Sequence, residues 1–572
     1  MAIYDIVIKD GIVVDGAGNQ RRRADVGIVG TNIAKIGRID DADAIRVIDA
    51  TGLIVAPGFI DLHTHYDAQI FWDPYLTTSG WHGVTSVVTG NCGFGFAPVL
   101  PELRERSMLS MTAVEAIPCD TLREGLPWDW VTFPEYLDSI DRTPKAINIL
   151  PYVPLNPLFV WVLGLDAAKA GKQPTDAENE AIARLFDEAM DAGACGWSAQ
   201  CLGQPGQPDA RLQQGDFDGT PMPTDVMWPS TRMTLAEVLG RRGEGFMQMS
   251  GTSITDEEYE SLVERSGRPL LWNAVIANTK TMLYRQRLAW LERCRAKGLP
   301  IYGQAMTTDP PIPFTFRTEG VLATSPLNTV REASTMEDKL AVLRDPAWRE
   351  ELRAFRSYAF NNIPDMSLMR TNDPDWKAFE GMTLSAIAEK CEGMDAVDVM
   401  CELSIADRCE TTFVTQQFSV TLDGLRELID DPYLIPGLSD GGAHVSFLSA
   451  GMYGTEYIVR YVRDLGFTTL EQAHWRLSGL PAHCAGFHDR GVLREGAAAD
   501  IIVYDLDELA YLEPELVNDL PAGSERVVIR ARGYRYTLVN GQVTIENDTE
   551  TNAMSGQLLR HGRAAKGSVT VL

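Results

Sequence analysis

The chain contains, at residues 58–65, the run Gly58-Phe59-Ile60-Asp61-Leu62-His63-Thr64-His65, an apolar stretch that ends in His-x-His. Its apolar part predicts a buried strand over Phe59–His63. Side chains two residues apart on a strand share a face, so His63 and His65 are expected to face one spot. Neutral imidazole nitrogen is a good ligand for zinc and related divalent metals. The run therefore predicts a metal site, against the simpler alternative of two polar residues that end a strand.

Seven further apolar runs alternate with segments of helical periodicity, a pattern typical of repeated βα units. Eight parallel strands with intervening helices are the number that closes a barrel. The sequence therefore predicts an α/β chain with a (β/α)8 TIM-like barrel over residues 57–484, with its chemistry at the carboxyl ends of the strands. After Phe59–His63, the predicted strands are Val84–Thr89, Ala146–Pro151, Ala194–Ala199, Gly245–Met249, Pro269–Ala274, Pro300–Ala305 and Leu434–Asp440.

Both ends of the chain have a different texture, with short strand-like runs broken by turn residues. Near the N-terminus, Ile6-Val7-Ile8 and Ile12-Val13-Val14 flank the turn pair Asp10-Gly11, and Asp500-Ile501-Ile502-Val503-Tyr504 looks similar near the other end. We expect residues 1–56 and 485–550 to pair into one small β-sandwich domain. Residues 551–572 are expected to be a C-terminal tail that is frayed or contacts another subunit.

Two connections between the predicted strands are too long for ordinary loops. Residues 201–228 are rich in Gly, Pro, Gln and Asp and are expected to lie over the barrel mouth. Residues 306–436 open with Asp309-Pro310-Pro311 and then show helical patterns over Leu384–Cys391 and Ala396–Ile405. This second segment is expected to be a lid or substrate-selecting insertion or, equally, a surface elaboration that supports oligomer contacts.

The composition limits the classes of partner. The 572 residues, 45% of them hydrophobic, provide for one large core and a smaller domain. A net charge of −28 would repel phosphate backbones and anionic lipid surfaces, so we expect neither a nucleic-acid nor a membrane partner. The nine scattered cysteines fit reduced thiols in the cytoplasm, and the N-terminus lacks the pattern of a signal peptide. The sequence leaves open whether the chain forms a homo-oligomer.

The run from Ala56 to Gln69 resembles the amidohydrolase superfamily, and specifically its N-acyl-D-amino-acid deacylase, or D-aminoacylase-like, branch. Further matching motifs are Gly83–Gly93, Gly437–Gly441 and Asp489–Gly496, the last followed by Ala499-Asp500-Ile501. The resemblance extends from one end of the chain to the other. It implies a metal-dependent hydrolase of carbon–nitrogen bonds other than peptide bonds, acting on a small N-acylated molecule.

The resemblance also implies roles for two residues beyond the histidine pair. The Cys92 thiolate, in a Gly-Asn-Cys-Gly turn, would bind metal, and thiolate is a good zinc ligand. Asp440 would be the general base that takes a proton from water and passes it to the leaving amine. Without the resemblance, Cys92 is a buried small residue and Asp440 an ordinary turn residue. His444 is either a polar loop residue or a contact of the metal ligands or the substrate.

Two histidines that deacylases of this branch carry at the ends of strands five and six are missing here. The matching segments hold Gln248 and Asn273, and no histidine occurs between Gly83 and Ala443. Neutral amides are poor metal ligands, so these two residues are expected to orient the substrate by hydrogen bonds. The remaining set predicts about one zinc, or another divalent metal, per chain, with Asp440 as a fourth ligand or mainly a base. That set is His63, His65, Cys92 and Asp440.

The sequence thus predicts hydrolysis of a linear amide of a small N-acylated substrate by metal-activated water. Two alternatives stay open: hydrolysis of an ester or cyclic amide by the same route, and a barrel that binds a ligand without catalysis. Residues 195–200 contain no lysine that could be carboxylated, which disfavours a dihydropyrimidinase-like site. The arginine-containing stretch that deacylases have after Ser-Asp-Gly is not recognisable in residues 443–449, which argues against an N-acyl-D-amino acid.

Overall fold

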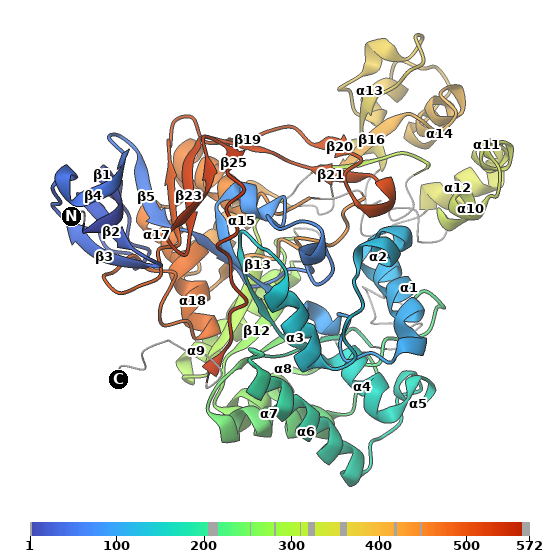
Figure 1. The fold of residues 1–572 in the computed structure, drawn as a ribbon. Coiled ribbons are helices and arrows are strands. Elements are labelled where there is room, and N and C mark those ends of the chain that lie inside the picture. Colours follow the sequence, from blue (N-terminus) through green and yellow to red (C-terminus); the bar gives the residue numbers. More distant parts are fainter. Residues whose placement is uncertain are drawn as a thin grey trace.

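A computed structural model describes residues 3–203, 216–251, 253–278, 282–308, 311–317, 326–354, 363–416, 420–446 and 449–562 (Figure 1). A strand overlaps each of the eight ranges predicted from the sequence. These strands are β6 (Phe59–Asp61), β7 (Val84–Thr89), β8 (Asn148–Pro151), β10 (Gly196–Cys201), β11 (Phe246–Gly251), β12 (Leu270–Val275), β13 (Ile301–Met306) and β17 (Ile435–Gly437). They are buried almost throughout, as expected for parallel strands covered on both faces.

The eight strands pair in parallel in two sheets. One sheet has the order β6-β7-β8, and the other has the order β17-β13-β12-β11-β10-β9, where β9 (Val153–Pro154) follows β8 after a single residue. The β8–β9 segment therefore links the two sheets. The opposite edge strands of the two sheets are β6 and β17. The residues that follow them also lie side by side, because the His65 N–H donates to the Gly441 carbonyl oxygen at 2.7 Å.

Helices connect the strands, and their ends follow local sequence signals. For example, α6 begins after Thr175, which forms a capping box with Glu178, and ends at Gly193 in the left-handed conformation. The helices outside the 306–436 segment are α1 (Arg104–Glu115), α2 (Cys119–Gly125), α3 (Phe133–Arg142), α4 (Leu155–Leu163), α5 (Leu165–Lys169), α6 (Asp176–Ala192), α7 (Pro229–Arg242), α8 (Asp256–Ser266), α9 (Leu283–Ala296), α16 (Tyr453–Glu456), α17 (Leu470–His474) and α18 (Leu480–Ala485). One further helix, α15 (Leu422–Asp430), lies near the end of that segment and packs into the main core.

Both chain ends join in one nine-stranded sheet with the order β25-β24-β23-β18-β5-β1-β2-β3, in which β4 also pairs with β1. At its centre β5 is antiparallel to β18, with Pro57 opposite Ile501. Because β6 begins only one residue after β5, this sheet anchors the strand that leads to the histidine pair. The strands are β1 (Tyr4–Val13), β2 (Arg22–Val29), β3 (Asn32–Gly37), β4 (Ala44–Asp49), β5 (Ile54–Pro57), β18 (Ile501–Tyr504), β23 (Tyr534–Val539), β24 (Gln542–Glu546) and β25 (Thr549–Glu550).

A buried polar cluster joins this terminal sheet to the parallel strands. The Asp500 carboxylate accepts hydrogen bonds from Arg490 Nη1 at 2.7 Å, from Asn148 Nδ2 at 3.1 Å and from the Asn540 N–H at 2.7 Å. Asn148 belongs to β8, whereas Asn540 directly follows β23. Burial raises the pKa of Asp500 despite the Arg490 charge, so the carboxylate depends on these donors.

Replacing Arg490 by Met is therefore expected to lower the free energy of unfolding by about 3–5 kcal/mol, because Asp500 would lose its buried counter-charge. The exposed Arg184, 3.9 Å from Glu188, provides the control. Arg184→Met should change the same quantity by less than about 1 kcal/mol. Urea unfolding of both variants measures the two changes. Equal losses of unfolding free energy would show that the buried Arg490–Asp500 pair stabilises the fold no more than an exposed pair does.

Residues of the 306–436 segment form a separate group of helices and strands with its own apolar core, which projects from the rest of the molecule in Figure 1. Helices lie at both places where the sequence shows helical periodicity. The strands are β14 (Pro311–Phe314), β15 (Ser367–Arg370) and β16 (Thr412–Gln416), all antiparallel. The helices are α10 (Asn328–Glu332), α11 (Met336–Arg344), α12 (Pro346–Ala354), α13 (Leu384–Ala388) and α14 (Ala396–Ala406). Asp309 and Pro310 lie outside the described residues.

The C-terminal segment differs from the sequence expectation. Residues 557–559 lie beside β8: the Ile149 N–H donates to the Gln557 carbonyl at 3.0 Å, and the Leu559 N–H donates to the Ile149 carbonyl at 2.8 Å. Leu558 is buried. This stretch is therefore not frayed, because it pairs with the backbone of β8 and buries an apolar side chain, whereas the expected subunit contact stays a prediction. Residues 563–572 lie outside the described part of the chain.

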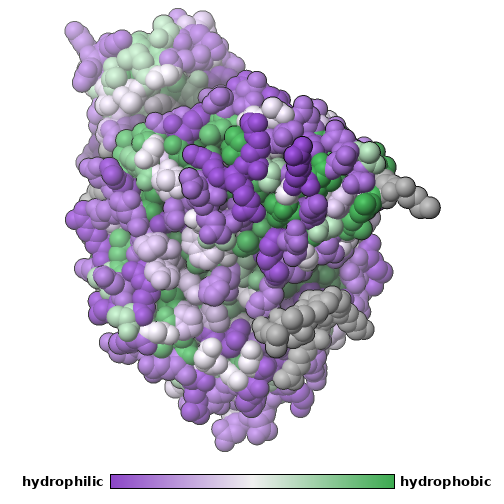
Figure 2. Space-filling model, turned by 90° about the vertical axis from the view of Figure 1, so that its left-hand side faces the viewer, coloured by the Kyte–Doolittle hydropathy of each residue, from purple (hydrophilic) through white to green (hydrophobic). Residues whose placement is uncertain are grey.

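The outer face seen in Figure 2 is mainly hydrophilic with scattered hydrophobic residues, in keeping with the chain's large net charge. In the described residues, no helix combines the length and apolar character that crossing a bilayer requires. All nine cysteines are free thiols in the structure.

Candidate metal centre

The two histidines of the His-x-His run lie together where β6 ends. The His63 N–H donates to Asp61 Oδ1 at 3.1 Å, and the His65 N–H donates to the Gly441 carbonyl, so the backbone of both residues is fixed. Both imidazoles are buried, and their ring centroids are 5.4 Å apart. The strand geometry thus brings the two side chains together, as the sequence predicts.

Cys92 reaches the same point from the turn that follows β7. Its φ of 57° lies in the left-handed region, and its N–H donates to Gln248 Oε1 at 2.7 Å. The Cys92 Sγ lies 3.5 Å from His63 Nε2. The ligand atoms of His63, His65 and Cys92 all lie within 4.8 Å of one another, and among the described residues no other group of three such side chains does so. This spacing fits one metal ion bound by two nitrogens and a sulfur.

Asp440 completes the cluster from the loop after β17. Its Oδ1 lies 3.2 Å from His63 Nε2 and 3.7 Å from His65 Nε2. Its side chain is 22% exposed, whereas those of the two histidines are 1% and 2% exposed, so it stands on the solvent side. Like Cys92, Asp440 has a positive φ, and so does His444. Such strained backbone positions tend to cluster at functional sites.

The surroundings set the protonation of these groups. Burial lowers the pKa of His65 to about 3, which keeps its imidazole in the neutral, metal-binding form. Desolvation also acts to lower the pKa of His63, but the Cys92 and Asp440 charges hold it well above its usual value. Desolvation acts to raise the pKa of Asp440, yet its hydrogen bond and charge interaction with His63 lower it to about 2. The Cys92 and Asp440 charges thus favour a positive charge at the place where they meet His63.

Gln248 and Asn273, at the positions where a histidine is missing, touch the candidate ligands themselves. Besides accepting from the Cys92 N–H, Gln248 donates through Nε2 to Ser250 Oγ at 2.9 Å, and that oxygen is 3.4 Å from Cys92 Sγ. The Asn273 amide contacts His63 Nδ1, on the side of the ring away from Cys92 and Asp440. Both amides therefore lie where they can position Cys92 and His63.

Glu115, the last residue of α1, also belongs to this site, although no sequence motif marks it. Its side chain is buried, with Oε1 3.4 Å from His65 Nδ1 and Oε2 3.9 Å from His444 Nε2. Burial raises the pKa of Glu115 well above its usual value. The one signal in the sequence is an acidic residue in the last turn of a helix, where the helix dipole disfavours negative charge.

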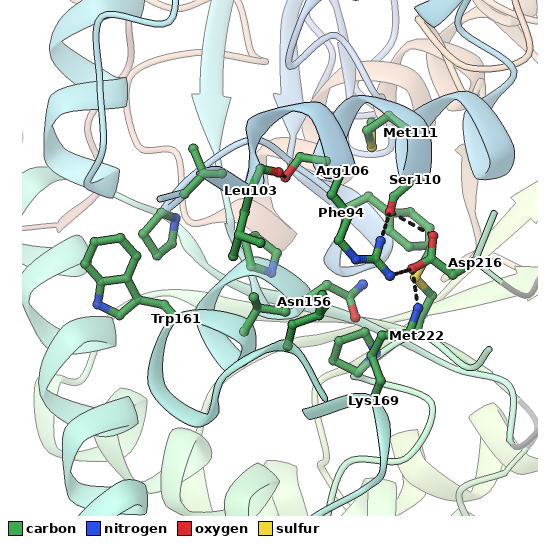
Figure 3. Close-up of a pocket in the computed structure, with 18 of the residues that line it drawn as sticks. Phe94, Leu103, Arg106, Ser110, Met111, Asn156, Trp161, Lys169, Asp216 and Met222 are labelled. Atoms are coloured by element: carbon green, nitrogen blue, oxygen red, sulfur yellow. Dashed lines mark hydrogen bonds and ion pairs between the residues drawn. The ribbon is translucent and has the colours of Figure 1, made fainter. Parts of the chain in front are cut away.

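A pocket lies beside this cluster (Figure 3). Phe94 connects the two, because it lines the pocket and its ring centroid lies 6.4 Å from that of His65. The cavity of about 80 Å³ has room for on the order of five waters, so it is larger than a packing defect. It is lined by residues of α1 and α4 and by Asp216, Met222 and Pro223 of the long 201–228 connection, of which residues 204–215 lie outside the described chain.

Comparison with known proteins places this α/β chain in a family. A model of the amidohydrolase family matches residues 46–200 and 264–545, so the chain belongs to the amidohydrolase family and is a hydrolase of carbon–nitrogen bonds other than peptide bonds. It is similar to D-aminoacylase of Alcaligenes xylosoxydans xylosoxydans, 29% identical over 97% of each chain. N-acyl-D-glutamate deacylase of the same organism is 27% identical over 99% of this chain and 98% of its own. The D-aminoacylase-like branch inferred from the sequence is thereby confirmed.

Solved structures agree with the fold. A structure of D-aminoacylase has a TM-score of 0.65 and 23% identity, covering 97% of this chain and 100% of that one. A structure of N-acyl-D-glutamate deacylase from Bordetella bronchiseptica, in complex with zinc and a phosphonate inhibitor, has a TM-score of 0.63 and 24% identity, covering 97% and 99%. The fold of this chain is therefore similar to that of the deacylases over nearly its whole length.

Proposed function

We propose that the chain hydrolyses the linear amide bond of a small N-acylated substrate, with one divalent metal, zinc foremost, held by His63, His65 and Cys92. The observation that carries this proposal is the convergence of these three buried ligand atoms within 4.8 Å, with the Asp440 carboxylate against both imidazoles. The similarity to enzymes named as N-acyl amino acid deacylases supports the substrate class. So does the zinc in the related deacylase structure.

We also propose that residues 57–484 form one closed (β/α)8 barrel. Its strands are β6, β7, β8–β9, β10, β11, β12, β13 and β17. The link between β8 and β9 and the contact between His65 and Gly441 support closure at both seams between the sheets. In the same proposal, residues 1–56 and 485–550 make one small β-sandwich domain, and residues 306–436 act as a lid or insertion. The metal cluster then lies at the carboxyl ends of the strands, where barrels of this type carry their chemistry.

The donor set fits a single zinc ion. Two imidazole nitrogens and one thiolate are typical zinc ligands, and three protein ligands leave a position open for water. Gln248 and Asn273 offer neutral amides that are already engaged with Cys92 and His63, so they do not supply a second site. A metal bound here would polarise the substrate carbonyl and lower the pKa of a water molecule.

Asp440 is proposed to move the proton. Its carboxylate stands on the solvent side of the histidines, within reach of a water molecule that approaches the same point. It can accept a proton as that water attacks the carbonyl carbon, and then give the proton to the leaving nitrogen. One residue thereby serves both halves of the reaction, and the products are a carboxylic acid and an amine.

Two neighbours are proposed to hold the histidines in position. When Nε2 of an imidazole binds metal, Nδ1 carries the proton and needs an acceptor. Glu115 stands at Nδ1 of His65, and Asn273 stands at Nδ1 of His63, where its amide can turn to present oxygen. Both would fix the rings in the metal-binding tautomer.

Replacing Glu115 by Gln is accordingly expected to weaken zinc affinity by about 10- to 100-fold, because Gln cannot ionise to accept the His65 Nδ1 proton when a metal binds Nε2. Zinc titration against a chelator measures this change. The thermal unfolding of the metal-free protein should stay the same, because Gln closely replaces a protonated Glu. Glu102→Gln, at an exposed acid just before α1, is the matched control and should leave affinity unchanged. Unaltered zinc affinity in Glu115→Gln would contradict the positioning role.

The reaction class is tested with a panel of N-acylated amino acids of both chiralities, matched esters and cyclic amides. We expect the zinc-loaded protein to turn over linear amides with the highest kcat/KM. Turnover of esters or cyclic amides alone would replace the proposed reaction by hydrolysis of another acyl bond. Zinc binding without turnover of any of these compounds would favour a barrel that binds a ligand without catalysis.

A further inference from the structure

We infer that the pocket beside the metal centre binds an uncharged, apolar acyl chain of the substrate. This inference rests on the proposed amide hydrolysis and adds the substrate class. We call this cavity the acyl pocket. Its apolar walls are Phe94, Leu103, Met111, Val160, Trp161 and Met222.

Most of the walls come from α1, α4 and the segment that follows the Cys92 turn. Met111 lies one helical turn before Glu115 on α1, and Val160 and Trp161 lie on α4. Phe94 follows the Cys92 turn, so the acyl pocket and the metal cluster share one short segment of chain. In Figure 3 the labelled Leu103 and Trp161 lie on one side of the cavity and Met222 on the other. An apolar group that enters would bury surface on both sides and gain hydrophobic free energy.

Charged residues at one end of the acyl pocket neutralise one another. Arg106 pairs with Asp216 at 2.6 Å, and Lys169 pairs with Asp216 at 2.5 Å and with Asp218 at 3.0 Å. Ser110 also donates to Asp216, at 2.7 Å. With two cations against two carboxylates in mutual contact, this end offers no unpaired charge to a ligand carboxylate. A charged chain would have to break these partly buried pairs, so the acyl pocket favours an uncharged one.

Asn156 is the polar residue of α4 that lines the acyl pocket. Asn156 is 8% exposed, and its Oδ1 accepts from the Thr224 N–H and hydroxyl, both at 3.0 Å. Its Nδ2 has no hydrogen-bond partner in the described chain. That nitrogen is fully buried beside Gly93, so the preference of the acyl pocket for an acyl chain rests on its apolar walls and not on a hydrogen bond from Asn156. Figure 3 shows Asn156 between the apolar residues and the ion-pair cluster.

The position of the acyl pocket decides which half of the substrate it takes. Its walls follow β7, β9 and β10, whereas Asp440 follows β17 and must face the leaving nitrogen to protonate it. The acyl chain and the nitrogen leave the carbonyl carbon in different directions. A substrate whose nitrogen faces Asp440 would therefore direct its acyl chain toward Phe94 and the acyl pocket.

The test uses linear N-acyl-glycines from acetyl to octanoyl, with zinc-loaded wild type, Val160→Trp and Leu163→Trp. In wild type, kcat/KM should rise by about fourfold per added methylene until the acyl pocket is full. Val160→Trp fills the cavity and should remove most of this rise, so that kcat/KM becomes nearly independent of acyl chain length. Leu163 lies on the same helix but lines a different cavity, so Leu163→Trp should keep the wild-type profile.

A wild-type chain-length profile in Val160→Trp would overturn the inference. A second series with a fixed acetyl group and increasingly large amines distinguishes the two halves of the substrate. If Val160→Trp alters this amine series and not the acyl series, the acyl assignment is wrong. Failure of the proposed function looks different, because zinc-loaded wild type would then hydrolyse no amide. Calorimetric binding of N-octanoyl-glycine to metal-free protein would still test the acyl pocket, with weaker binding expected in Val160→Trp only.

Discussion

Replacing Asp440 by Asn is expected to lower kcat for amide hydrolysis by roughly 10³-fold, the size typical of a lost general acid–base group. Asn keeps the shape of the side chain and a carbonyl oxygen toward His63 and His65, but it cannot accept and return a proton. An amide needs that proton because a free amine anion is a very poor leaving group. The expected loss therefore falls on the chemical step more than on KM.

An ester with a good leaving group provides the internal control for Asp440→Asn, because such a leaving group departs without being protonated. We expect the variant to lose much less activity on such an ester than on the matched amide. Zinc content should stay close to that of the wild type, because His63, His65 and Cys92 remain. Loss of zinc would instead make Asp440 a metal ligand, and unchanged amide turnover would exclude it from the proton transfer.

Replacing His63 by Ala is expected to abolish zinc binding and to reduce amide hydrolysis to background, a fall of at least roughly 10³-fold. The His63 Nε2 faces both the Cys92 sulfur and the Asp440 carboxylate, so its removal breaks the centre of the cluster. Elemental analysis and the amide assay are made on the same preparation.

His488→Ala is the matched control for this variant, because His488 is an exposed histidine outside the cluster. It should retain both zinc and activity. His63 is fully buried, so circular dichroism must show that the His63→Ala variant is folded. A folded His63→Ala protein with wild-type zinc content and turnover would contradict the assigned ligand set.

The parallel strands could be predicted because their sequences are short runs rich in apolar residues, as in Leu270–Val275. Helices α13 and α14 could be predicted from their periodicity in the same way. His63, His65, Cys92 and Asp440 could be named because each lies at or shortly after the end of a predicted strand, in a recognisable motif. The structure then brings these four together.

Other features depend on three-dimensional contacts that no local pattern encodes. Glu115 lies far from every motif, and only the packing of α1 against the cluster brings it to His65. The contacts of Gln248 and Asn273 with Cys92 and His63 depend on side-chain direction, which strand alternation alone does not give. The pairing of residues 557–559 with Ile149 was missed for a similar reason, because the free backbone beside β8 is visible only in the assembled sheet.

Titration of zinc into metal-free wild-type protein, with amide hydrolysis followed at each step, tests the single-metal centre most directly. We expect activity to rise linearly and to reach its plateau at about one zinc per chain, because one set of three ligands is present. Full amide hydrolysis by the metal-free protein would contradict this mechanism, and a plateau only at about two zinc ions per chain would contradict the single site.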